Sequence, residues 1–513
     1  MFKRLLTVAG YTALSRVTGF LLNVVMATVL GAGPMSDAFW VAFRLPNSFR
    51  SIFGEGAFSA AFLPRFTKLH TQEGPEAANR FANAVYSWQI AAQLILLIAA
   101  WLGMRYVIVA MAPGFGARPG QLDLATALGR IAFPYLIMTV SSVQLSAMLN
   151  AVGKFAAAAA WSILLNLTMI AALFAARWFP SAAYAAACGV FLGGVAQLVF
   201  ISWAAARSHL RLRIRRPRWT PEMKNFMVAL GAATFGSASV QIALLIDTQI
   251  SSFLPSGVLT AISYADRINQ LPLGVLGVAL GTVLLPEMSR RLAQGDEAGS
   301  HAAQNRSAAL GLFLTLPFAA AFLIVPQTIM RAIFMHGAFH ADAAAISASA
   351  LSGYAVGLPA FVLVRLLTAT FYARHDTATP VRATWLAVAV NVGFKLLLVF
   401  GLHWGAFGVA LGTSLGSWAN VSMLFWLSRR RKLLIIDDTF RRSLLPTILG
   451  ALSTAGLALL GVSCAFVLVP HAGLWQREAA LGLAVIFAGV GYGLIALWFR
   501  SRLPIGRFAR KSR

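Results

Sequence analysis

Long apolar segments alternate with short polar segments along the whole chain. A helix that crosses the hydrocarbon core of a bilayer needs about 20 mostly apolar residues, and fourteen segments meet this requirement. The polar connections between them are too short to bury a core of their own. The pattern therefore predicts an all-α polytopic membrane protein whose function resides in its helix bundle. The predicted spans are residues 8–30, 37–63, 83–111, 126–150, 158–178, 184–206, 225–254, 260–287, 307–333, 345–372, 383–401, 405–428, 444–469 and 478–499.

The composition agrees with a membrane protein. Of the 513 residues, 59% are hydrophobic and only 11% are charged, whereas a soluble globular protein is about 25% charged. These values exclude a soluble enzyme, a disordered chain and a secreted disulfide scaffold. Cys188 and Cys464 lie inside apolar segments without metal-ligand spacing, so we expect both to be packing residues.

The basic residues are distributed unevenly between the two sides of the predicted bundle. Thirty of the 42 Lys and Arg residues lie at the termini and in alternate connections, whereas the opposite connections hold only Arg118, Arg177 and Arg477. Since basic connections stay in the cytoplasm, both termini are predicted to be cytoplasmic. The arginine-rich segment 207–224 is interpreted as a topology determinant that attracts anionic lipids, and not as a nucleic-acid site.

A weak internal repeat relates the two halves of the chain. Segment 57–68 resembles segment 279–290, and Pro64 matches Pro286. The matched segments are six spans apart, which predicts two six-helix lobes in the same orientation, a parallel pseudo-repeat. The predicted organisation is an N-lobe at 1–206, a basic loop at 207–224, a C-lobe at 225–428, a basic loop at 429–443, two further spans at 444–499 and a basic tail at 500–513.

The candidate chemistry consists of charged residues at membrane depth. No P-loop, HExxH or GxSxG motif occurs, and the eight histidines form no metal-like cluster, so we expect no catalysis, metal or cofactor. Arg16 lies two turns into the first span, and the second span carries Asp37, Arg50 and Glu55 among its charges. Pro46 and the glycines beside Glu55 predict that the second helix is bent or broken.

The eighth span repeats this combination, with Asp266 and Arg267 ahead of Pro272. Buried charges cost several kcal/mol unless they meet a partner or an aqueous cavity. One interpretation is a set of ion pairs that lock helices together: Arg16 with Asp37, Arg50 with Glu55 and Arg267 with Asp266. The other is a hydrated cationic cavity, in which three arginine forks bind the oxygens of a diphosphate.

The same residues resemble a known family, the MurJ/MviN lipid II flippases. The likeness covers nearly the whole chain and is most specific in the first 65 residues. It is carried by Ser15-Arg16-Val17, Gly19-Phe20, Gly31-Ala32-Gly33, Asp37-Ala38-Phe39, Val41-Ala42-Phe43, Leu45-Pro46-Asn47, Arg50, Glu55-Gly56-Ala57-Phe58-Ser59, Tyr264-Ala265-Asp266-Arg267, Gly274-Val275-Leu276-Gly277, Phe371-Tyr372-Ala373-Arg374 and Thr379-Pro380-Val381. The chain departs from the family at Leu22-Asn23, where an Arg followed by Asp is frequent.

The resemblance implies a fold, an activity and a site. The fold would have fourteen helices, with two lobes around a cationic cavity and two last helices that form a groove for a polyprenyl tail. The activity would be the flipping of an undecaprenyl-diphosphate-linked peptidoglycan precursor to the periplasmic leaflet of the inner membrane, by alternating access and without catalysis. Other cell-wall synthesis proteins would be further partners. The implied substrate-binding residues are Arg16, Arg50 and Arg267, and the implied cavity or gating residues are Ser15, Asp37, Glu55 and Asp266.

Two questions stay open at the level of the sequence. Asp247 in the seventh span and Lys395 in the eleventh are interpreted as a buried structural pair or, alternatively, as a proton-coupling site, and the lysine argues against sodium. Other functions are a flippase for another polyprenyl-linked oligosaccharide, a cation-coupled multidrug exporter, and a scaffold without transport. An exporter of cationic drugs would require a carboxylate-lined pocket, and not three arginines.

Overall fold

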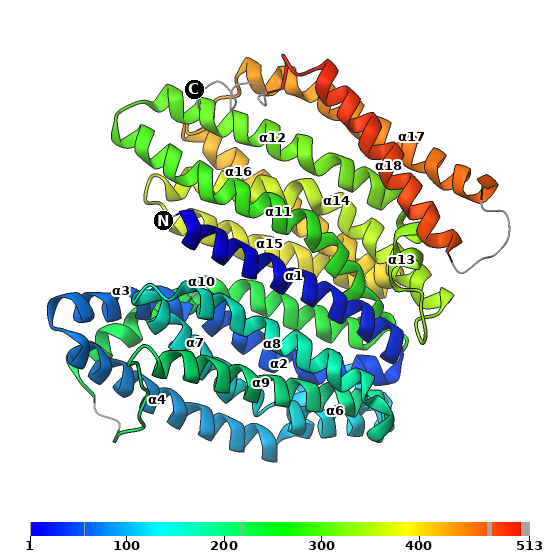
Figure 1. The fold of residues 1–513 in the computed structure, drawn as a ribbon. Helices are drawn as coiled ribbons and strands as arrows, with labels where there is room; N and C mark the ends of the chain where they lie inside the picture. Colours follow the sequence, from blue (N-terminus) through cyan, green and yellow to red (C-terminus); the bar gives the residue numbers. More distant parts are fainter. Residues whose placement is uncertain (1, 56, 217–218, 469–474, 504–513) are drawn as a thin grey trace. The chain divides into compact units, whose positions relative to one another are not determined.

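The computed structural model describes residues 2–55, 57–216, 219–468 and 475–503, and side chains for these except 2–9, 52–55, 57, 235–240 and 275–283. Every regular element within the described residues is helical. The chain forms two compact units, one of residues 1–260 with 337–339 and the other of residues 261–336 with 340–513. Figure 1 shows the long helices of each unit lying roughly along one another.

The first unit holds the helices up to α10. They are α1 (Phe2–Leu30), α2 (Pro34–Glu55), α3 (Ala57–Gln72), α4 (Pro75–Leu102), α5 (Met104–Met111), α6 (Pro119–Ala132), α7 (Tyr135–Ala151), α8 (Phe155–Phe174), α9 (Ala182–Ala206) and α10 (Pro221–Ser252). Short 3₁₀ turns, η1 (Pro113–Ala117) and η2 (Ala176–Trp178), follow α5 and α8.

The second unit holds the remaining helices apart from the first turn of α11. They are α11 (Val258–Ala293), α12 (Glu297–Ile324), α13 (Pro326–Phe334), α14 (Ala341–Tyr372), α15 (Ala378–Leu396), α16 (Gly405–Arg430), α17 (Asp438–Leu468) and α18 (Gln476–Trp498). A single π-helical turn, η3 (Leu397–Gly401), extends α15.

All fourteen predicted spans are helical, which confirms the all-α membrane fold. Ten stretches of described helix are long and apolar enough to cross a membrane. The predicted spans outside these ten are the second, seventh, eighth and twelfth, which correspond to α2 with α3, α10, α11 and α16. The second and eighth are the spans in which the sequence places the charges of the candidate cavity other than Arg16, which lies in the first span.

Three predicted spans are divided, where the sequence suggested single helices. Span 83–111 comprises α4 and α5 with a break at Gly103, span 126–150 is interrupted before Tyr135, and span 307–333 is interrupted at Val325. Pro134 and Pro326 stand at the latter two interruptions. Proline has no N–H and suits the start of a helix, so each interruption begins a new helix.

The second span, by contrast, is not interrupted at Pro46. Helix α2 continues through this proline to Glu55, and α3 begins at Ala57. Helix α11 likewise continues through Pro272 and Pro286. Neighbouring helices can satisfy the carbonyl that a proline leaves without a donor, which is why membrane helices tolerate proline. Residue 56, between α2 and α3, lies outside the described residues.

A stack of phenylalanine rings joins α3, α4 and α10 in the first unit. Phe58, Phe62 and Phe66 follow one face of α3, with ring centroids 5.1 and 5.4 Å apart. Phe81 stacks on Phe62 at 5.6 Å, and Phe226 meets Phe58 edge-on at 5.8 Å. The three rings of α3 are four residues apart, which is the spacing that brings side chains of one helix together.

The last two helices pack on α12 of the second unit. Figure 1 shows α17 and α18 side by side at the end of the chain. The Tyr492 ring of α18 lies 4.7 Å from the Phe313 ring, and its hydroxyl donates to the Phe313 carbonyl. A Cβ atom at Gly450 would lie 2.7 Å from the Tyr492 ring, so glycine allows α17 to approach α18 closely.

The packing places α10 with the first unit, which extends to Thr260. The sequence division at 206/225 follows the pseudo-repeat and assigns this helix to the second half. Helix α10 contacts α2 and α3, and Arg44 of α2 donates to the Thr248 hydroxyl over 3.0 Å. The lobe boundaries inferred from the repeat describe the symmetry of the chain and differ from the boundaries of the compact units. They therefore stay a prediction.

Candidate functional site

Arg16 lies on the open face of α1. The opposite face packs on α8, where the Ser15 and Ser162 hydroxyls are 3.1 Å apart and Asn166 Nδ2 donates to Thr18 Oγ1 over 3.0 Å. Successive residues of a helix project about 100° apart. Fixing Ser15 against α8 therefore turns Arg16 outward, and its side chain is exposed.

The two positions at which α1 departs from the family are both accommodated within the helix bundle. Leu22 is buried, with 8% of its surface exposed. The Asn23 amide donates to the Gly19 carbonyl of its own helix over 2.6 Å. Neither residue supplies a charge, so Arg16 is the only cation among the described side chains of α1.

Asp37, at the start of α2, binds the first turn of α11. Its Oδ2 accepts the backbone N–H of Gly257 at 2.6 Å, and its Oδ1 accepts the backbone N–H of Thr260 at 2.9 Å and the Thr260 hydroxyl at 2.6 Å. The carboxylate is 2% exposed. It thus acts as an N-cap supplied by another helix, and it satisfies donors that a helix start leaves unpaired.

Neighbouring loops reinforce this contact. Arg118 Nη2 donates to the Leu254 carbonyl over 2.8 Å, and the Gly114 N–H donates to Ser252 Oγ over 3.0 Å. Gly257 has a φ of 91°, and a Cβ there would lie 2.8 Å from the Ala32 carbonyl oxygen. Glycine alone combines that backbone conformation with so close an approach. We call Asp37, Arg118, Leu254, Gly257 and Thr260 the Asp37 cluster.

The second half of α2 is more open than the first. Residues 36–43 are buried, whereas Arg50 is half-buried and its Nε donates to Asn47 Oδ1 over 3.1 Å. Glu55 is the last residue of α2, and its side chain lies outside the described residues. The proposed ion pair between Arg50 and Glu55 therefore stays a prediction.

Asp266 and Arg267 lie on the less buried side of α11 in the second unit. Tyr264 and Ala265 just before them are fully buried, and the Tyr264 ring stacks on Phe334 at 5.1 Å. Asp266 Oδ2 accepts a hydrogen bond from the Gln270 amide one turn further on. Because Tyr264 and Ala265 occupy the buried face of the helix, Asp266 and Arg267 lie on the adjoining face, where both are half-buried.

Segment 371–381, which also carries the family resemblance, joins α14 and α15. Asp376 accepts from the Thr379 N–H at 3.0 Å, from the Thr379 hydroxyl at 2.7 Å and from Arg431 Nη1 at 2.8 Å. Burial raises the pKa of Asp376, but the hydrogen bonds from Thr379 and the charge of Arg431 lower it below its usual value overall. The carboxylate ties this connection to the end of α16.

Lys395 is fully buried on α15. Its aliphatic side-chain carbons pack against a glycine of α16. Gly412 and Gly416 of α16 face Lys395 and Asn391, and a Cβ at Gly412 would collide with Lys395. Small residues four apart allow membrane helices to pack closely. Asp247 is half-buried on α10 of the first unit, so its pairing with Lys395 stays a prediction.

We expect single and double variants to separate the two roles of Asp247 and Lys395. An uncompensated buried charge is costly, whereas a neutral pair of similar shape costs little. Asp247→Asn and Lys395→Met should each lower the yield of folded protein, and the double variant should recover it. Transport should be insensitive to sodium. A double variant that folds normally but is as inactive as Asp247→Asn would instead indicate proton coupling.

The charged residues are evident in the sequence, but the groups that hold some of them are not. Thr260 and Gly257, the partners of Asp37, and Ser162 and Asn166, the partners of α1, carry no local signal. Such contacts join residues more than 140 positions apart, and no local pattern encodes them. Within the described residues, no group of His, Cys, Asp and Glu side chains could hold a metal ion.

The fold resembles that of two solved membrane-protein structures. A multidrug-resistance MATE transporter of the MOP superfamily in an inward-facing conformation matches 82% of this chain and 95% of its own, with a TM-score of 0.69 and 16% identity. A "Lipid II flippase MurJ, inward closed conformation" matches 96% of this chain and 99% of its own, with a TM-score of 0.79 and 22% identity. These likenesses show that the chain shares the fold of the two structures.

Sequence comparison identifies the family. The family model "Lipid II flippase MurJ" matches residues 26–475. A relative from Rhizobium tropici, described as "Probable lipid II flippase MurJ", is 37% identical over 505 residues, which are 97% of this chain and 94% of the relative. The "Lipid II flippase MurJ" of Burkholderia cenocepacia is 33% identical over 466 residues, 89% of each chain. The chain belongs to the MurJ family, whose members are transporters and not enzymes.

Proposed function

We propose that this protein flips the undecaprenyl-diphosphate-linked peptidoglycan precursor, lipid II, from the cytoplasmic to the periplasmic leaflet. The observation that carries the proposal is the family match, which extends over residues 26–475 and includes Arg50 and Arg267, whereas Arg16 precedes the matched residues. Such a transporter makes and breaks no bond. Its chemistry consists of binding a charged headgroup, excluding competitors and exposing the site alternately to the two sides.

Arg16, Arg50 and Arg267 are the residues we assign to the diphosphate. Arg16 is exposed on α1, and Arg50 and Arg267 are half-buried on α2 and α11. A guanidinium presents a planar set of donors that can bind two phosphate oxygens at once. Ser15, Asp37, Glu55 and Asp266 would orient these arginines or control access to them. Asp37 would do so through its contact with the start of α11.

The Asp37 cluster supports an alternating-access mechanism. It joins the start of α2 to the segment between α10 and α11 by buried hydrogen bonds. We infer that it closes the end of the first unit at which α1 ends and α2 begins. Opening that end would exchange these bonds for hydration of the carboxylate. Such bistable contacts allow a packed structure to switch between two arrangements.

The charge distribution supports an orientation in the inner membrane. With both termini in the cytoplasm, the Asp37 cluster would lie on the periplasmic side and the segment 207–224 on the cytoplasmic side. The last helices, α17 and α18, would provide the groove for the polyprenyl tail. Anionic lipids would interact with the basic cytoplasmic loops, and other cell-wall synthesis proteins would be further partners.

Two other activities remain as alternatives. A flippase for another polyprenyl-linked oligosaccharide would use the same arginines, so the structure of the sugar is not distinguished. A cation-coupled multidrug exporter shares the fold, as the match to MATE transporters illustrates. Its cationic substrates would be repelled by Arg16, Arg50 and Arg267.

Depletion of the protein in its own cells tests the proposed function. Lipid II should accumulate in the cytoplasmic leaflet, because its synthesis continues while its export stops. Labelling of lipid II from the periplasmic side should fall, and re-expression of wild-type protein should restore it. Accumulation of a different polyprenyl-linked sugar, with normal lipid II export, would support the first alternative.

A cysteine at position 50 should report whether the proposed cavity contains water. In a variant with Cys188 and Cys464 replaced by serine, Arg50→Cys should react with a small charged thiol reagent, because Arg50 is only half-buried. Val41→Cys on the same helix is the control, since Val41 is 0% exposed. Equal protection of both cysteines would favour the dry ion-pair interpretation of Arg50.

A further inference from the structure

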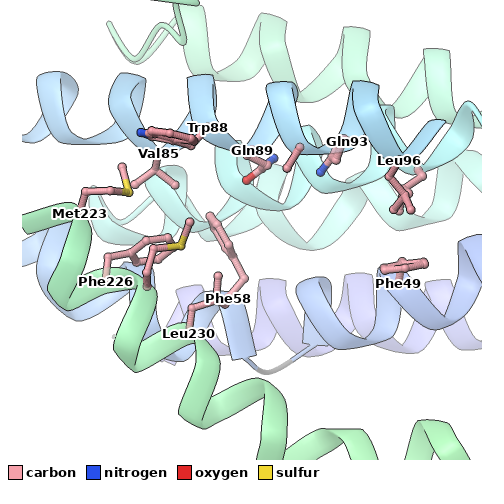
Figure 2. A pocket seen from close by; sticks show the side chains of 13 residues that line it. Phe49, Phe58, Val85, Trp88, Gln89, Gln93, Leu96, Met223, Phe226 and Leu230 are labelled. Atoms are coloured by element: carbon pink, nitrogen blue, oxygen red, sulfur yellow. The ribbon is translucent and has the colours of Figure 1, made fainter. Parts of the chain in front are cut away.

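An apolar pocket lies in the first unit, and none of the three candidate arginines is among its lining residues. Its volume is about 260 Å³. The lining comes from α2, α3, α4, α7 and α10, and includes Phe49, Phe58 and Phe226. Figure 2 shows the side chains of α4 on one side of this space and those of α10 and α3 on the other. Such a lining suits a hydrocarbon chain.

Two glutamines place unpartnered polar atoms at this apolar pocket. Gln89 and Gln93 follow each other by one turn on the face of α4 that lines it (Figure 2). Both amide atoms of Gln89 and the Oε1 of Gln93 are buried without a hydrogen-bond partner, and Gln93 is 8% exposed. Since buried polar groups are nearly always hydrogen-bonded, these atoms point to a ligand with a polar group.

The arginine-rich segment before α10 lies against the same part of α4. The backbone N–H of Arg213 donates to Asn83 Oδ1 over 2.7 Å, and that of Arg215 donates to Ser87 Oγ over 2.9 Å. Trp88, which lines the pocket, meets the Trp219 ring at 5.6 Å. The described arginine side chains of this segment are exposed: Arg211, Arg213, Arg215 and Arg216.

We propose that this pocket binds an anionic phospholipid, with one acyl chain between α4 and α10 and its phosphate at the arginines of residues 211–216. A phospholipid has an apolar acyl chain next to an anionic phosphate. The apolar pocket lies next to the basic segment in the same way, so the chain would match the pocket and the phosphate would match the arginines. Basic residues at a membrane surface attract anionic headgroups. The Gln89 amide Nε2 would donate to an ester carbonyl of the lipid. Arg16, Arg50 and Arg267 do not line the pocket, although Phe49 of the lining adjoins Arg50. The inference deepens the proposed contact of anionic lipids with the basic cytoplasmic loops, on which it rests, and it does not depend on lipid II flipping.

Binding of dioleoyl phosphatidylglycerol and dioleoyl phosphatidylcholine to delipidated protein, measured by native mass spectrometry, tests this site. The two lipids have the same chains and differ in net charge. Wild-type protein should bind one phosphatidylglycerol about tenfold more tightly than phosphatidylcholine, because each basic residue near a headgroup contributes a factor of several.

Two variants separate the chain site from the headgroup site. Ala92→Trp fills the pocket and should weaken binding of both lipids about tenfold, since each methylene kept out of the protein loses binding free energy. The double variant Arg213→Gln/Arg215→Gln should lower the preference for phosphatidylglycerol severalfold, because only Arg211 and Arg216 remain, and should leave phosphatidylcholine binding unchanged. The variants Ile95→Trp, at a position 71% exposed on α4, and Arg130→Gln/Arg177→Gln, at two exposed arginines outside the basic loops, are matched controls, and both should behave as wild type.

Thermal unfolding in detergent checks that each variant is folded. Equal affinity of wild-type protein for the two lipids would overturn the proposal, as would unchanged binding in a folded Ala92→Trp variant. Displacement of phosphatidylglycerol by an equal concentration of undecaprenyl phosphate, lost in Ala92→Trp, would show that the pocket holds a polyprenyl chain and would also overturn it.

Discussion

Replacement of Arg16, Arg50 or Arg267 by alanine is expected to abolish lipid II flipping while the protein still folds and inserts. Each arginine would make charge-assisted hydrogen bonds to the diphosphate, and the loss of two such bonds lowers binding about 100-fold or more. Arg16 is exposed and the other two are half-buried, so stability should change little. Flipping in reconstituted vesicles and complementation of depleted cells are the measurements.

Lysine at the same positions should rescue flipping poorly, because an ammonium group is a point charge and lacks the planar fork. Arg130→Ala is a matched control. It removes one positive charge from an exposed site in the first unit, where the guanidinium lies 5.6 Å from the Trp101 ring centroid. Complementation by all three alanine variants at normal expression would contradict the assignment of the arginines to phosphate.

Asp37→Ala is expected to destabilise the protein strongly. The change leaves the Gly257 N–H, the Thr260 N–H and the Thr260 hydroxyl without their acceptor in a buried place. Each unmade buried hydrogen bond costs about 1–3 kcal/mol, so the total is a large part of the stability of a typical domain, about 5–15 kcal/mol. Thermal unfolding in detergent and the yield of folded protein should both fall.

Thr260→Val is the graded control for this prediction. It removes one donor and keeps both backbone bonds to Asp37, so the loss should be about 1 kcal/mol. The loss of stability in Asp37→Asn should lie between those of Asp37→Ala and Thr260→Val. One carboxylate oxygen is replaced there by an amide NH₂, which is a donor and faces N–H groups that are also donors. An Asp37→Ala protein with normal stability and no flipping would show instead that Asp37 acts on the cavity and not as a cap.

The sequence by itself determined the membrane fold. Apolar segments of sufficient length specify helices wherever they occur, because an unpaired backbone cannot remain in hydrocarbon. The positions of Arg16, Arg50 and Arg267 were also evident, since a charge in an apolar span is rare and requires an explanation. These inferences depend only on the local pattern of residues, and the residues of a single helix are sufficient to show it.

The partners of the charged groups were decided by the tertiary structure. The sequence suggested Arg16 as a partner of Asp37, but the carboxylate accepts from Gly257 and Thr260, more than 200 residues further along the chain. The interruptions of spans at Gly103 and Val325, and the continuity of α2 through Pro46, also differ from the local expectation. At these positions, the helix continues or ends according to whether neighbouring helices provide hydrogen bonds to its backbone. The amino-acid composition does not show which helices are neighbours.

The same distinction applies to the apolar pocket and its polar atoms. In the sequence, Gln89 and Gln93 are two polar residues in a predicted span, and Arg213 and Arg215 are part of a topology signal. Only the fold places the basic segment against α4 beside the pocket. Hydrophobicity is a property of each residue and is read directly from the chain, whereas a binding site depends on distances between residues that the chain brings together only when it folds.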